Sequence, residues 1–546
     1  MTGVFLTLIQ PPFDMYMLAW VSFLPMAFIS SPAMKKRWLI LFGYISCVLY
    51  WLVNIYWLCL PTTLGCITFC LYMGIYWPLL SICIRYCRAR GLGLTFILPV
   101  LIVGAEAWQS CIFGGFSWRL LGHSMYKCIT MIQVADILGV AGITFYIAMV
   151  NGLLAELMLE HPRNKEFKVT LVAAVIIAVM FYGERQLDRT EKSMKAGPMI
   201  ASLQTNEPLT IDGIGFKADD IFEDMIAMSS ESLESSPAMI VWPETMVLNT
   251  FDSQYLDLRG SAYRGYEFEH IVRIFSMNSG VAMVIGATGG TAEYKPQSNT
   301  VALKDRTNAA YVYDSDGRQL ERYDKIHLVP FGEFVPFKYS WPWLYNILMK
   351  FTPYPEDDFS LLPGKEFTTY NLATPQGNYR YAIIICYEDT VVPLNRKFVV
   401  DANGVKRVDW LVNISNDGWF SWRNDEGDVV PTSELFQHAV ICSFRAVENR
   451  VGIVRSVNTG VSCFIEPTGR IKYGSAAGTL PGKVTERQGV SGWLADNIVV
   501  DDRVTFFSRH GQWLDYLAGI FFWPIIILSF QKLPKKEIEA KNVKVR

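Results

Sequence analysis

Apolar residues are concentrated in the first third of this 546-residue chain, and this uneven distribution constrains the fold more than any other feature. We predict membrane-spanning helices, because a bilayer core of about 30 Å is crossed by roughly 20 apolar residues in helical conformation. The predicted spans lie at 14–31, 38–58, 64–84, 92–112, 131–157, 168–183 and 512–530. So many apolar stretches argue against the alternative, a buried helical core in a soluble protein.

The amino terminus is the least regular part of the apolar region. Residues 2–10 resemble half of another span, and Pro11 follows them. A cleaved signal peptide is the competing interpretation. It is less favoured because no basic segment precedes the apolar residues and no clear cleavage site of small residues follows them.

Basic residues predict the orientation of the spans. Loops rich in Lys and Arg remain on the cytoplasmic side of a membrane. Such clusters follow alternate spans, at 35–37, 85–90 and 163–168, and another ends the chain after residue 531. All of them agree with one orientation, which places the long polar region between 185 and 510 on the outer face.

The chain therefore divides into four predicted parts. Residues 1–184 form a transmembrane helical domain, and residues 198–497 form a soluble domain. Residues 511–531 form a closing transmembrane helix, and residues 532–546 form a basic cytoplasmic tail. The formal net charge of −2 offers no basic stripe for phosphates, so no nucleic-acid partner is expected.

The soluble region alternates short apolar runs with amphipathic stretches. This pattern is typical of an α/β domain in which helices cover the sheet. The predicted strands lie at 199–204, 239–242, 281–286, 381–385 and 410–414, with a strand pair at 452–465; the predicted helices lie at 218–230, 266–278 and 433–449. Residues 299–313 read as a hairpin, because charged residues 304–306 interrupt the run in its middle.

Cysteine spacing does not indicate a metal centre. The chain has 11 Cys, but no Cys-x-x-Cys pair and no cluster of Cys and His. A zinc or iron–sulfur site is therefore not expected, and neither is any other metal or cofactor. In the soluble region only Cys386, Cys442 and Cys463 occur, so no disulfide framework is implied, and a single bridge between the last two is the alternative.

Three residues in the soluble region carry the elements of covalent catalysis. Cys386 follows the apolar run 381–385, and Glu244 follows the apolar run 239–242. Lys325 lies between them in the segment Tyr-Asp-Lys. A thiol needs activation, which a neighbouring ammonium and a carboxylate base supply, and the ammonium also stabilises an oxyanion. Each residue alone is a weak signal, but the three together are specific.

The surrounding motifs resemble those of the apolipoprotein N-acyltransferase family, membrane enzymes that carry a nitrilase-like (carbon–nitrogen hydrolase) domain. The matching segments are Trp-Pro-Glu at 242–244, Lys-Ile-His-Leu-Val-Pro-Phe-Gly-Glu at 325–333, Cys-Tyr-Glu at 386–388 and Asn-Ile-Ser-Asn-Asp-Gly-Trp-Phe at 413–420. Arg-Ala-Val-Glu-Asn-Arg at 445–450 is also similar to the family. The resemblance covers nearly the whole chain and implies an αββα sandwich attached to a multi-span α-helical membrane domain.

The resemblance implies roles for individual residues. Cys386 would be the nucleophile, Glu244 the general base and acid, and Lys325 the oxyanion stabiliser. Glu333 would orient Lys325 or assist proton transfer. Tyr387 and Glu388 would line the site, or else support it structurally. Residues 416, 417, 445 and 448 are more typical of the scaffold than of the chemistry.

The implied reaction is a two-step acyl transfer without a cofactor. A phospholipid, in the family chiefly phosphatidylethanolamine, would acylate Cys386, and the amino-terminal S-diacylglyceryl-cysteine of a lipoprotein would take the acyl group. The implied protein acts as a monomer in the bacterial inner membrane, with its catalytic domain on the periplasmic face. One alternative is a membrane-tethered amidase that hydrolyses a soluble carbon–nitrogen substrate. Another is a transport or assembly protein whose soluble domain only binds.

A further set of aromatic and basic residues is predicted to contact lipid. These residues are Trp118, Arg119, Phe216, Trp343, Trp419 and Phe420. Phe216 stands where the family has a functional Trp. Residues 341–351 are predicted to form a mobile lid. For each, plain packing or interfacial anchoring is the alternative.

Overall fold

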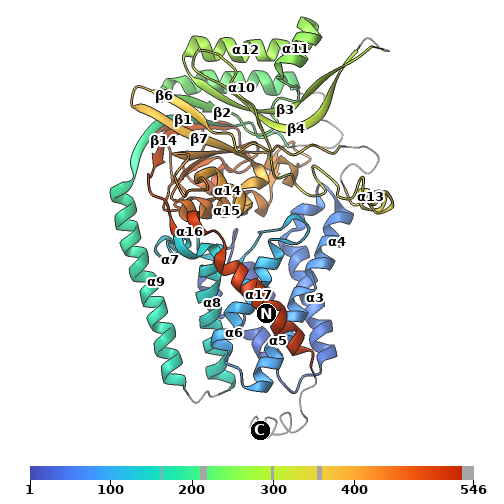
Figure 1. Ribbon diagram of the computed structural model, residues 1–546, viewed down its shortest axis with the longest axis vertical. Helices are drawn as coiled ribbons and strands as arrows, with labels where there is room; N and C mark the ends of the chain where they lie inside the picture. The colour runs from blue at the N-terminus through green and yellow to red at the C-terminus, as the bar shows by residue number, and fades with distance from the viewer. Residues whose placement is uncertain (161–163, 209–217, 297–299, 353–358, 532–546) are drawn as a thin grey trace. The chain divides into compact units, whose positions relative to one another are not determined.

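The computed structural model describes residues 1–160, 164–208, 218–296, 300–352 and 359–531 (Figure 1). The chain separates into two compact units. The first comprises Met1–Cys59, Thr63–Arg189 and the chain from His510 onward, and the second comprises Leu60–Thr62 and Thr190–Arg509. Phe216 and the basic tail 532–546 lie outside the described residues.

The first unit is helical. Its α-helices are α1 (Thr2–Leu8), α2 (Leu24–Ile29), α3 (Lys36–Asn54), α4 (Thr63–Met73), α5 (Tyr76–Arg90), α6 (Leu94–Gln109), α7 (Ile129–Ile132), α8 (Ala135–Leu159), α9 (Lys165–Ser193) and α17 (Trp513–Ser529). Short 3₁₀ turns are η1 (Tyr16–Val21), η2 (Tyr56–Cys59), η3 (Ile112–Gly114) and η4 (Leu121–Met125). Within the described part of the chain, four helical stretches are long and apolar enough to cross a membrane: α3, α4 continuing into α5, α8 and α9.

Helices occupy the predicted spans except at the start of the chain, but α6 and α17, with 16 and 17 residues, are shorter than the four span-length stretches. The predicted span 14–31 is not one helix, because it divides into η1 and α2. Pro25 occupies the first turn of α2, where its missing N–H and fixed φ suit a helix start rather than a helix interior. This interruption explains why the apolar run did not give one continuous helix.

A buried glutamate joins α6 to α8. Glu106 accepts hydrogen bonds from the Leu121 backbone N–H (2.6 Å) and from the Thr144 hydroxyl (2.7 Å). Gly104 of the same helix faces α17, and a Cβ there would lie 2.8 Å from the Ala518 carbonyl oxygen. Buried polar groups with partners and close backbone contacts at small residues are typical of helix packing in membranes.

The second unit is an α/β sandwich. Its strands are β1 (Lys195–Gln204), β2 (Met239–Val241), β3 (Ala282–Lys295), β4 (Thr300–Tyr313), β5 (Tyr323–Asp324), β6 (Tyr370–Thr374), β7 (Gly377–Ile385), β8 (Trp410–Ser415), β9 (Ser421–Arg423), β10 (Val429–Pro431), β11 (Gly452–Val457), β12 (Cys463–Ile465), β13 (Ala477–Gly478) and β14 (Gly492–Val500). They form a seven-stranded sheet β13-β14-β1-β2-β3-β4-β5, a five-stranded sheet β12-β11-β8-β7-β6 and a small ribbon β10-β9.

Helices cover the outer faces of the two large sheets. The helices of this unit are α10 (Ala218–Ser232), α11 (Ser253–Arg259), α12 (Arg264–Ser279), α13 (Pro342–Met349), α14 (Val392–Val399), α15 (Ser433–Asn449) and α16 (Phe506–His510), with short 3₁₀ turns η5 (Leu233–Ser235), η6 (Gly260–Ala262), η7 (Cys386–Thr390), η8 (Asp417–Phe420) and η9 (Val484–Arg487). Figure 1 shows α10 and α12 on the seven-stranded sheet and α14 and α15 on the five-stranded sheet. Side chains of α10 and α12, including Phe222 and Phe268, are buried against Trp242.

Hydrogen bonds link the two sheets across the middle of the sandwich. The Ser456 hydroxyl on β11 contacts the carbonyl oxygens of Leu203 and Val241, each at 2.9 Å. The Ser202 hydroxyl on β1 donates to the Arg455 carbonyl oxygen at 3.0 Å. The predicted architecture, a region of apolar helices with an αββα sandwich, is confirmed.

The predicted hairpin at 299–313 is wrong in its detail. Residues 300–313 form the single strand β4, which pairs along its length with β3. The charged residues 304–306 do not form a turn, because they lie on an exposed part of the strand beyond the buried half. Asp305 has a φ of 49°, and the pairing shifts register between Gly289 and Thr291.

The two large sheets present parallel strand ends. β2 pairs in parallel with β1 and β3, and β8 pairs in parallel with β7 and β11. The carboxyl ends of parallel strands meet at one edge of a sheet, where α/β proteins commonly bind their ligands. A functional site is therefore expected in the turns that follow β2, β7 and β8.

Candidate active site

Glu244 lies in the turn that follows β2, and its carboxylate is buried with three donors around it. Its side chain is 6% exposed. Oε1 accepts from the Asn308 amide nitrogen at 2.6 Å and from Lys325 Nζ at 3.2 Å. Oε2 accepts from the Asn416 backbone N–H at 2.8 Å. These donors fix the carboxylate in one position.

Lys325 follows β5 directly, and its ammonium group joins two carboxylates. Nζ lies 3.2 Å from Glu244 Oε1 and 2.9 Å from Glu333 Oε1, and the side chain is only 1% exposed. Burial alone would lower the pKa of Lys325, but Glu244 and Glu333 raise that pKa well above its usual range. The structure therefore holds Lys325 as a cation.

Asn308, on β4, was not predicted from the sequence. Its side-chain nitrogen donates to Glu244 Oε1 at 2.6 Å and to Glu333 Oε1 at 2.8 Å. Asn308 and Lys325 thus contact the same two carboxylate oxygens. In the sequence, the only sign of its role is that a polar residue directly precedes the apolar run 309–313. The structure shows that this residue is buried.

Cys386 lies immediately after β7, at the first position of η7. Its φ is 51°, in the left-handed region that non-glycine residues rarely adopt. The residue as a whole is half-buried, whereas Glu244 and Lys325 are buried, so Cys386 is the most exposed of the three. Such backbone strain occurs often at functional sites.

The thiol of Cys386 rests in its neutral form. Burial of the sulfur and the nearby Glu244 carboxylate raise the pKa of Cys386 well above its usual range, and Lys325 offsets only part of that effect. The sequence predicts that the lysine favours the thiolate. The lysine does act in that direction, but the other two influences are larger. A base is therefore needed at the moment of attack.

Glu388 ties two backbone segments together behind Cys386. Its carboxylate accepts from the backbone N–H groups of Ile326 (2.7 Å), His327 (3.0 Å) and Ile385 (2.8 Å). The Tyr323 hydroxyl also donates to it at 2.9 and 2.8 Å. Burial raises the pKa of Glu388 to about 7. These contacts are those of a residue that positions the chain around Lys325 and Cys386.

Tyr387 and Glu333 complete the surroundings. The Tyr387 ring stacks on His327 with ring centroids 5.9 Å apart. Glu333 Oε2 accepts from the Val329 backbone N–H at 2.7 Å while its other oxygen contacts Lys325. Glu333 therefore anchors the loop that follows Lys325.

The residues predicted to contact lipid have different environments. Trp118 is buried and stacks on Phe116, with ring centroids 5.5 Å apart. Arg119 donates to the Tyr50 hydroxyl at 3.1 Å and to the Leu6 carbonyl oxygen at 2.9 Å. Contacts of this kind favour the alternative, internal packing, for both residues.

The other predicted lipid contacts lie in the second unit. Trp343, on α13, is 66% exposed, in the segment predicted to be a lid. Trp419 and Phe420 are half-buried on η8, in the turns after β8. Their contact with lipid stays a prediction.

The arrangement as a whole suits covalent acyl transfer. The thiol of Cys386 lies near a fixed carboxylate that can take its proton, and a buried ammonium can stabilise a developing negative charge. These groups are already in position before the reaction begins. Such preorganisation is the main source of electrostatic catalysis. The same groups could use either an amine or water as the second nucleophile.

Comparisons with known proteins agree with this architecture. Residues 2–153 match the family model described as "Apolipoprotein N-acyltransferase N-terminal domain", and residues 200–480 match "Carbon-nitrogen hydrolase". The apolipoprotein N-acyltransferase of Geobacter metallireducens is 27% identical over 494 residues, 86% of this chain and 85% of its own length. That of Chlorobaculum tepidum is 25% identical over 521 residues, 90% of this chain and 88% of its own.

Solved structures with a similar arrangement include an amidase from Nesterenkonia sp. It is 16% identical, with a TM-score of 0.35, and the match covers 59% of this chain and 96% of that one.

The family models and the curated relatives define a carbon–nitrogen hydrolase domain joined to apolar membrane helices, in a bacterial membrane protein. Within that class, the chain belongs to the apolipoprotein N-acyltransferase family, and it is an acyltransferase.

Proposed function

We propose that this protein transfers an acyl chain from a phospholipid to the amino-terminal S-diacylglyceryl-cysteine of lipoproteins. The observation that carries the proposal is the cluster of Glu244, Lys325 and Glu333 beside the strained Cys386, in a chain of this family. Phosphatidylethanolamine is the proposed donor, and a diacylated lipoprotein is the proposed acceptor. No group beyond the side chains of the protein is needed for the chemistry.

In the first half-reaction the thiol of Cys386 attacks the ester carbonyl of the phospholipid. Glu244 takes the thiol proton as the carbon–sulfur bond forms, since the thiol is neutral at rest. The carbonyl oxygen becomes an oxyanion, which the Lys325 ammonium stabilises. The tetrahedral intermediate collapses, Glu244 returns the proton to the leaving alkoxide, and a lysophospholipid leaves. Cys386 now carries the acyl group as a thioester.

In the second half-reaction the lipoprotein amine attacks the thioester carbonyl. Glu244 accepts a proton from the amine, Lys325 again stabilises the oxyanion, and the carbon–sulfur bond breaks. The thiolate takes the proton from Glu244, and the N-acylated lipoprotein leaves. The two substrates therefore use the same site in turn, as in ping-pong kinetics.

The remaining residues have supporting roles in this proposal. Glu333 and Glu388 position Lys325 and the turn that bears Cys386, which their backbone contacts support. Tyr387 lines the site. Among the aromatic residues, Trp343, Trp419 and Phe420 are the proposed contacts for acyl chains, and Trp343 has the exposure that such a role needs.

The proposed location is the bacterial inner membrane, with the catalytic domain on the periplasmic face. The basic clusters at 35–37, 85–90 and 163–168 support this orientation. The proposed division is a helical domain at 1–184, a catalytic domain at 198–497, a closing helix at 511–531 and a cytoplasmic tail at 532–546. The protein is proposed to act as a monomer, since one chain contributes every group named above.

Intact mass spectrometry after incubation with phosphatidylethanolamine tests the proposal. The purified protein and its Cys386→Ser variant are incubated in parallel, and half of each sample then receives neutral hydroxylamine. The expected result is a fatty-acyl adduct on the wild type alone, located on Cys386 and removed by hydroxylamine, because hydroxylamine cleaves thioesters. Adding a diacylated lipopeptide should discharge the adduct and yield the N-acylated peptide.

The absence of an adduct from any phospholipid, with Cys386 reduced and the protein folded, would contradict the proposal. Ammonia release from amides would then test the amidase alternative. An adduct that forms normally but is discharged only by water would retain the thioester and remove the lipoprotein acceptor. If Cys386→Ser retained the whole biological function, a binding protein would be the better conclusion.

A further inference from the structure

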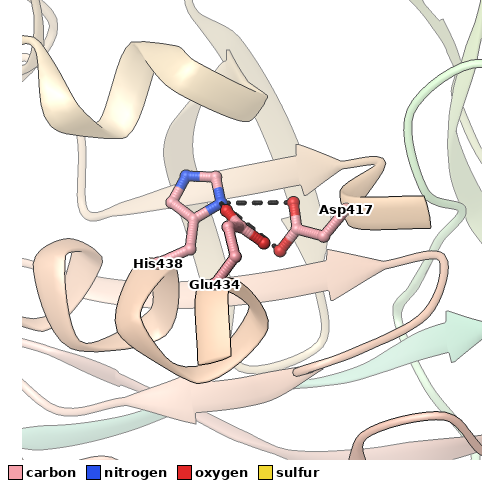
Figure 2. A group of neighbouring side chains, drawn as sticks. All are labelled: Asp417, Glu434 and His438. Carbon is pink, nitrogen blue, oxygen red and sulfur yellow. Dashed lines mark hydrogen bonds and ion pairs between the residues drawn. The ribbon is translucent and has the colours of Figure 1, made fainter. Parts of the chain in front are cut away.

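A second group of ionisable side chains lies beneath the turns that follow β7 and β8. Asp417, on η8, and Glu434 and His438, one helical turn apart on α15, bring their ligand atoms within 4.8 Å of one another. All three side chains are buried, with at most 2% exposed. Figure 2 shows the carboxylates of Asp417 and Glu434 directed at the same ring nitrogen of His438. The mechanism proposed above makes no use of this group.

Glu434 is the member that the protein alone leaves unsatisfied. Its side chain is fully buried, and among the described residues neither carboxylate oxygen has a hydrogen-bond partner. His438 Nδ1 is 3.5 Å from Oε1, which is beyond a good hydrogen bond. Buried polar groups nearly always have partners, so an orphaned carboxylate of this kind indicates a missing ligand.

The spacing of the three ligand atoms suits a metal ion. His438 Nδ1 lies 3.1 Å from Asp417 Oδ1 and 3.5 Å from Glu434 Oε1. A first-row divalent cation holds nitrogen and oxygen ligands at about 2.1 Å, so neighbouring ligand atoms around it are roughly 3 to 3.5 Å apart. These two distances fall in that interval, and all three ligand atoms lie within 4.8 Å of one another.

The surroundings of His438 also fit a ligand role. Its other ring nitrogen, Nε2, lies 2.8 Å from Asp389 Oδ1. A histidine that binds a metal through one nitrogen usually donates its other N–H to a carboxylate, which orients the ring. Asp389 is in turn held by Arg455, whose Nη1 donates to Asp389 Oδ2 at 2.9 Å.

The charges of the group balance with a divalent cation. Asp389, Asp417 and Glu434 contribute three negative charges when ionised. Arg455 contributes one positive charge and contacts Asp417 Oδ2 at 2.9 Å through Nη2. A histidine that binds a metal is neutral, so these groups would carry two negative charges around the bound ion, and a single divalent cation would neutralise them.

We propose that Asp417, Glu434 and His438 bind one divalent transition-metal cation, with Asp389 as the outer partner of His438. One imidazole and two carboxylates favour Zn²⁺ or Mn²⁺ over Ca²⁺, which prefers oxygen ligands alone. The ion joins α15 to the turns after β7 and β8, because Asp389 lies in the turn that begins at Cys386. Its role is structural, since it holds the turn that bears the thiol and takes no part in the reaction.

Metal content of the full-length protein tests the proposal directly. The wild type, Glu434→Gln and Glu426→Gln carry a tag without histidines and are expressed in medium supplemented with Zn²⁺ or Mn²⁺. They are purified in detergent and measured by plasma mass spectrometry. Glu426, on an exposed turn, is a matched control, because its substitution removes the same charge away from the group. X-ray absorption of the wild type then identifies the ligands.

About one equivalent of one of these metals is expected in the wild type and in Glu426→Gln, with at least a tenfold loss in Glu434→Gln. X-ray absorption should show nitrogen and oxygen ligands including one imidazole, a measurement that does not depend on the variant folding. Wild-type protein with less than about 0.1 equivalent of either metal would overturn the proposal. Equal metal content in a folded Glu434→Gln, or sulfur ligation, would also overturn it.

Discussion

At the scale of single residues, the site combines an unreactive resting state with a fixed base. The usual route to a reactive cysteine is a lowered pKa, which leaves a thiolate before any substrate arrives. Here burial and the Glu244 carboxylate act against the thiolate, and Lys325 offsets only part of their effect. A thiol of this kind is protected from indiscriminate reaction and gains its nucleophilicity only when Glu244 takes its proton.

Alkylation of Cys386 by iodoacetamide, followed site by site with mass spectrometry, measures this property. Because the thiolate is the reacting form, the rate should rise about tenfold per pH unit from pH 6 to pH 9 without levelling off. The Cys386→Ser variant is the control, because any alkylation that it shows occurs at the other thiols. A rate that levels off below pH 8 would mean that Lys325 prevails and that Cys386 rests as a thiolate.

Asn308→Ala should slow acyl transfer strongly while leaving donor binding almost intact. Asn308 donates to both Glu244 and Glu333, so its loss leaves Lys325 alone between two carboxylates that repel each other. Displacement of a catalytic group by about 1 Å costs on the order of 100-fold in rate, which is the fall in kcat that we expect. KM for phospholipid should change little.

Asn371→Ala is the matched control for this experiment, because Asn371 is exposed on β6. Its kinetics should be those of the wild type. A normal kcat in Asn308→Ala would show that Lys325 suffices to hold both carboxylates.

The sequence predicted part of this site and could not predict the rest. A recognisable local motif surrounds each of Glu244, Lys325 and Cys386, so the sequence alone predicts that they act together. Asn308 carries no motif, because its importance depends on the antiparallel pairing that places β4 beside β5. Glu434 and His438 are one helical turn apart and could have been noticed, but only the fold brings Asp417 to them.

At the scale of elements, Glu388 is the residue that couples several of them. One carboxylate receives the backbone N–H at the end of β7 and two N–H groups from the loop that follows β5. The turn with Cys386 and the loop with Lys325 therefore share a buried anchor. Because the pKa of Glu388 is about 7, the charge of this anchor changes near neutral pH.

The pH dependence of stability follows from the raised pKa of Glu388. Its pKa is about 7 in the folded protein and about 4.3 in an unfolded chain. Between these values the folded state holds more protons than the unfolded state. The stabilisation is therefore fully present below about pH 4.3 and is lost as the pH rises through 7, a change of about 3 to 4 kcal/mol.

Thermal unfolding of the wild type and Glu388→Gln across pH 4.5 to 8.5 measures this effect. Glutamine does not titrate, so the difference in Tm between wild type and variant should shrink as the pH rises to 7 and stay constant above about pH 8. Glu426→Gln, which removes an exposed carboxylate, should run parallel to the wild type. A difference that is constant across the whole range would mean that Glu388 stays ionised throughout.

The helices and strands also show where the pattern of apolar residues predicts secondary structure correctly. Long apolar helices such as α3, α8 and α9 were predicted because their length alone identifies them. The run at 14–31 has the same composition, yet it divides at Pro25, which periodicity does not register. The charged segment 304–306 suggested a turn that does not exist, since a paired strand can carry charges where it continues beyond the buried part of its sheet.

At the scale of the whole molecule, the chain combines two units of different architecture. Each unit has its own internal packing, apolar helices in one and a double sheet covered by helices in the other. A carbon–nitrogen hydrolase domain for a soluble substrate needs at most one helix as a tether. The many apolar helices are instead in keeping with substrates that are themselves held in the membrane, as the proposed phospholipid and lipoprotein are.

Reporter fusions test the orientation that this function needs. Alkaline phosphatase requires disulfides, which form in the periplasm and not in the cytoplasm, whereas green fluorescent protein folds and fluoresces in the cytoplasm. Alkaline phosphatase fused after Met194, beyond α9, should be active, and the same enzyme fused after Arg90 should be inactive. Green fluorescent protein fused after Arg546 should fluoresce, because the basic clusters retain these segments in the cytoplasm. The reverse pattern would place Cys386 on the side away from exported lipoproteins, and the proposed acceptor would then be excluded.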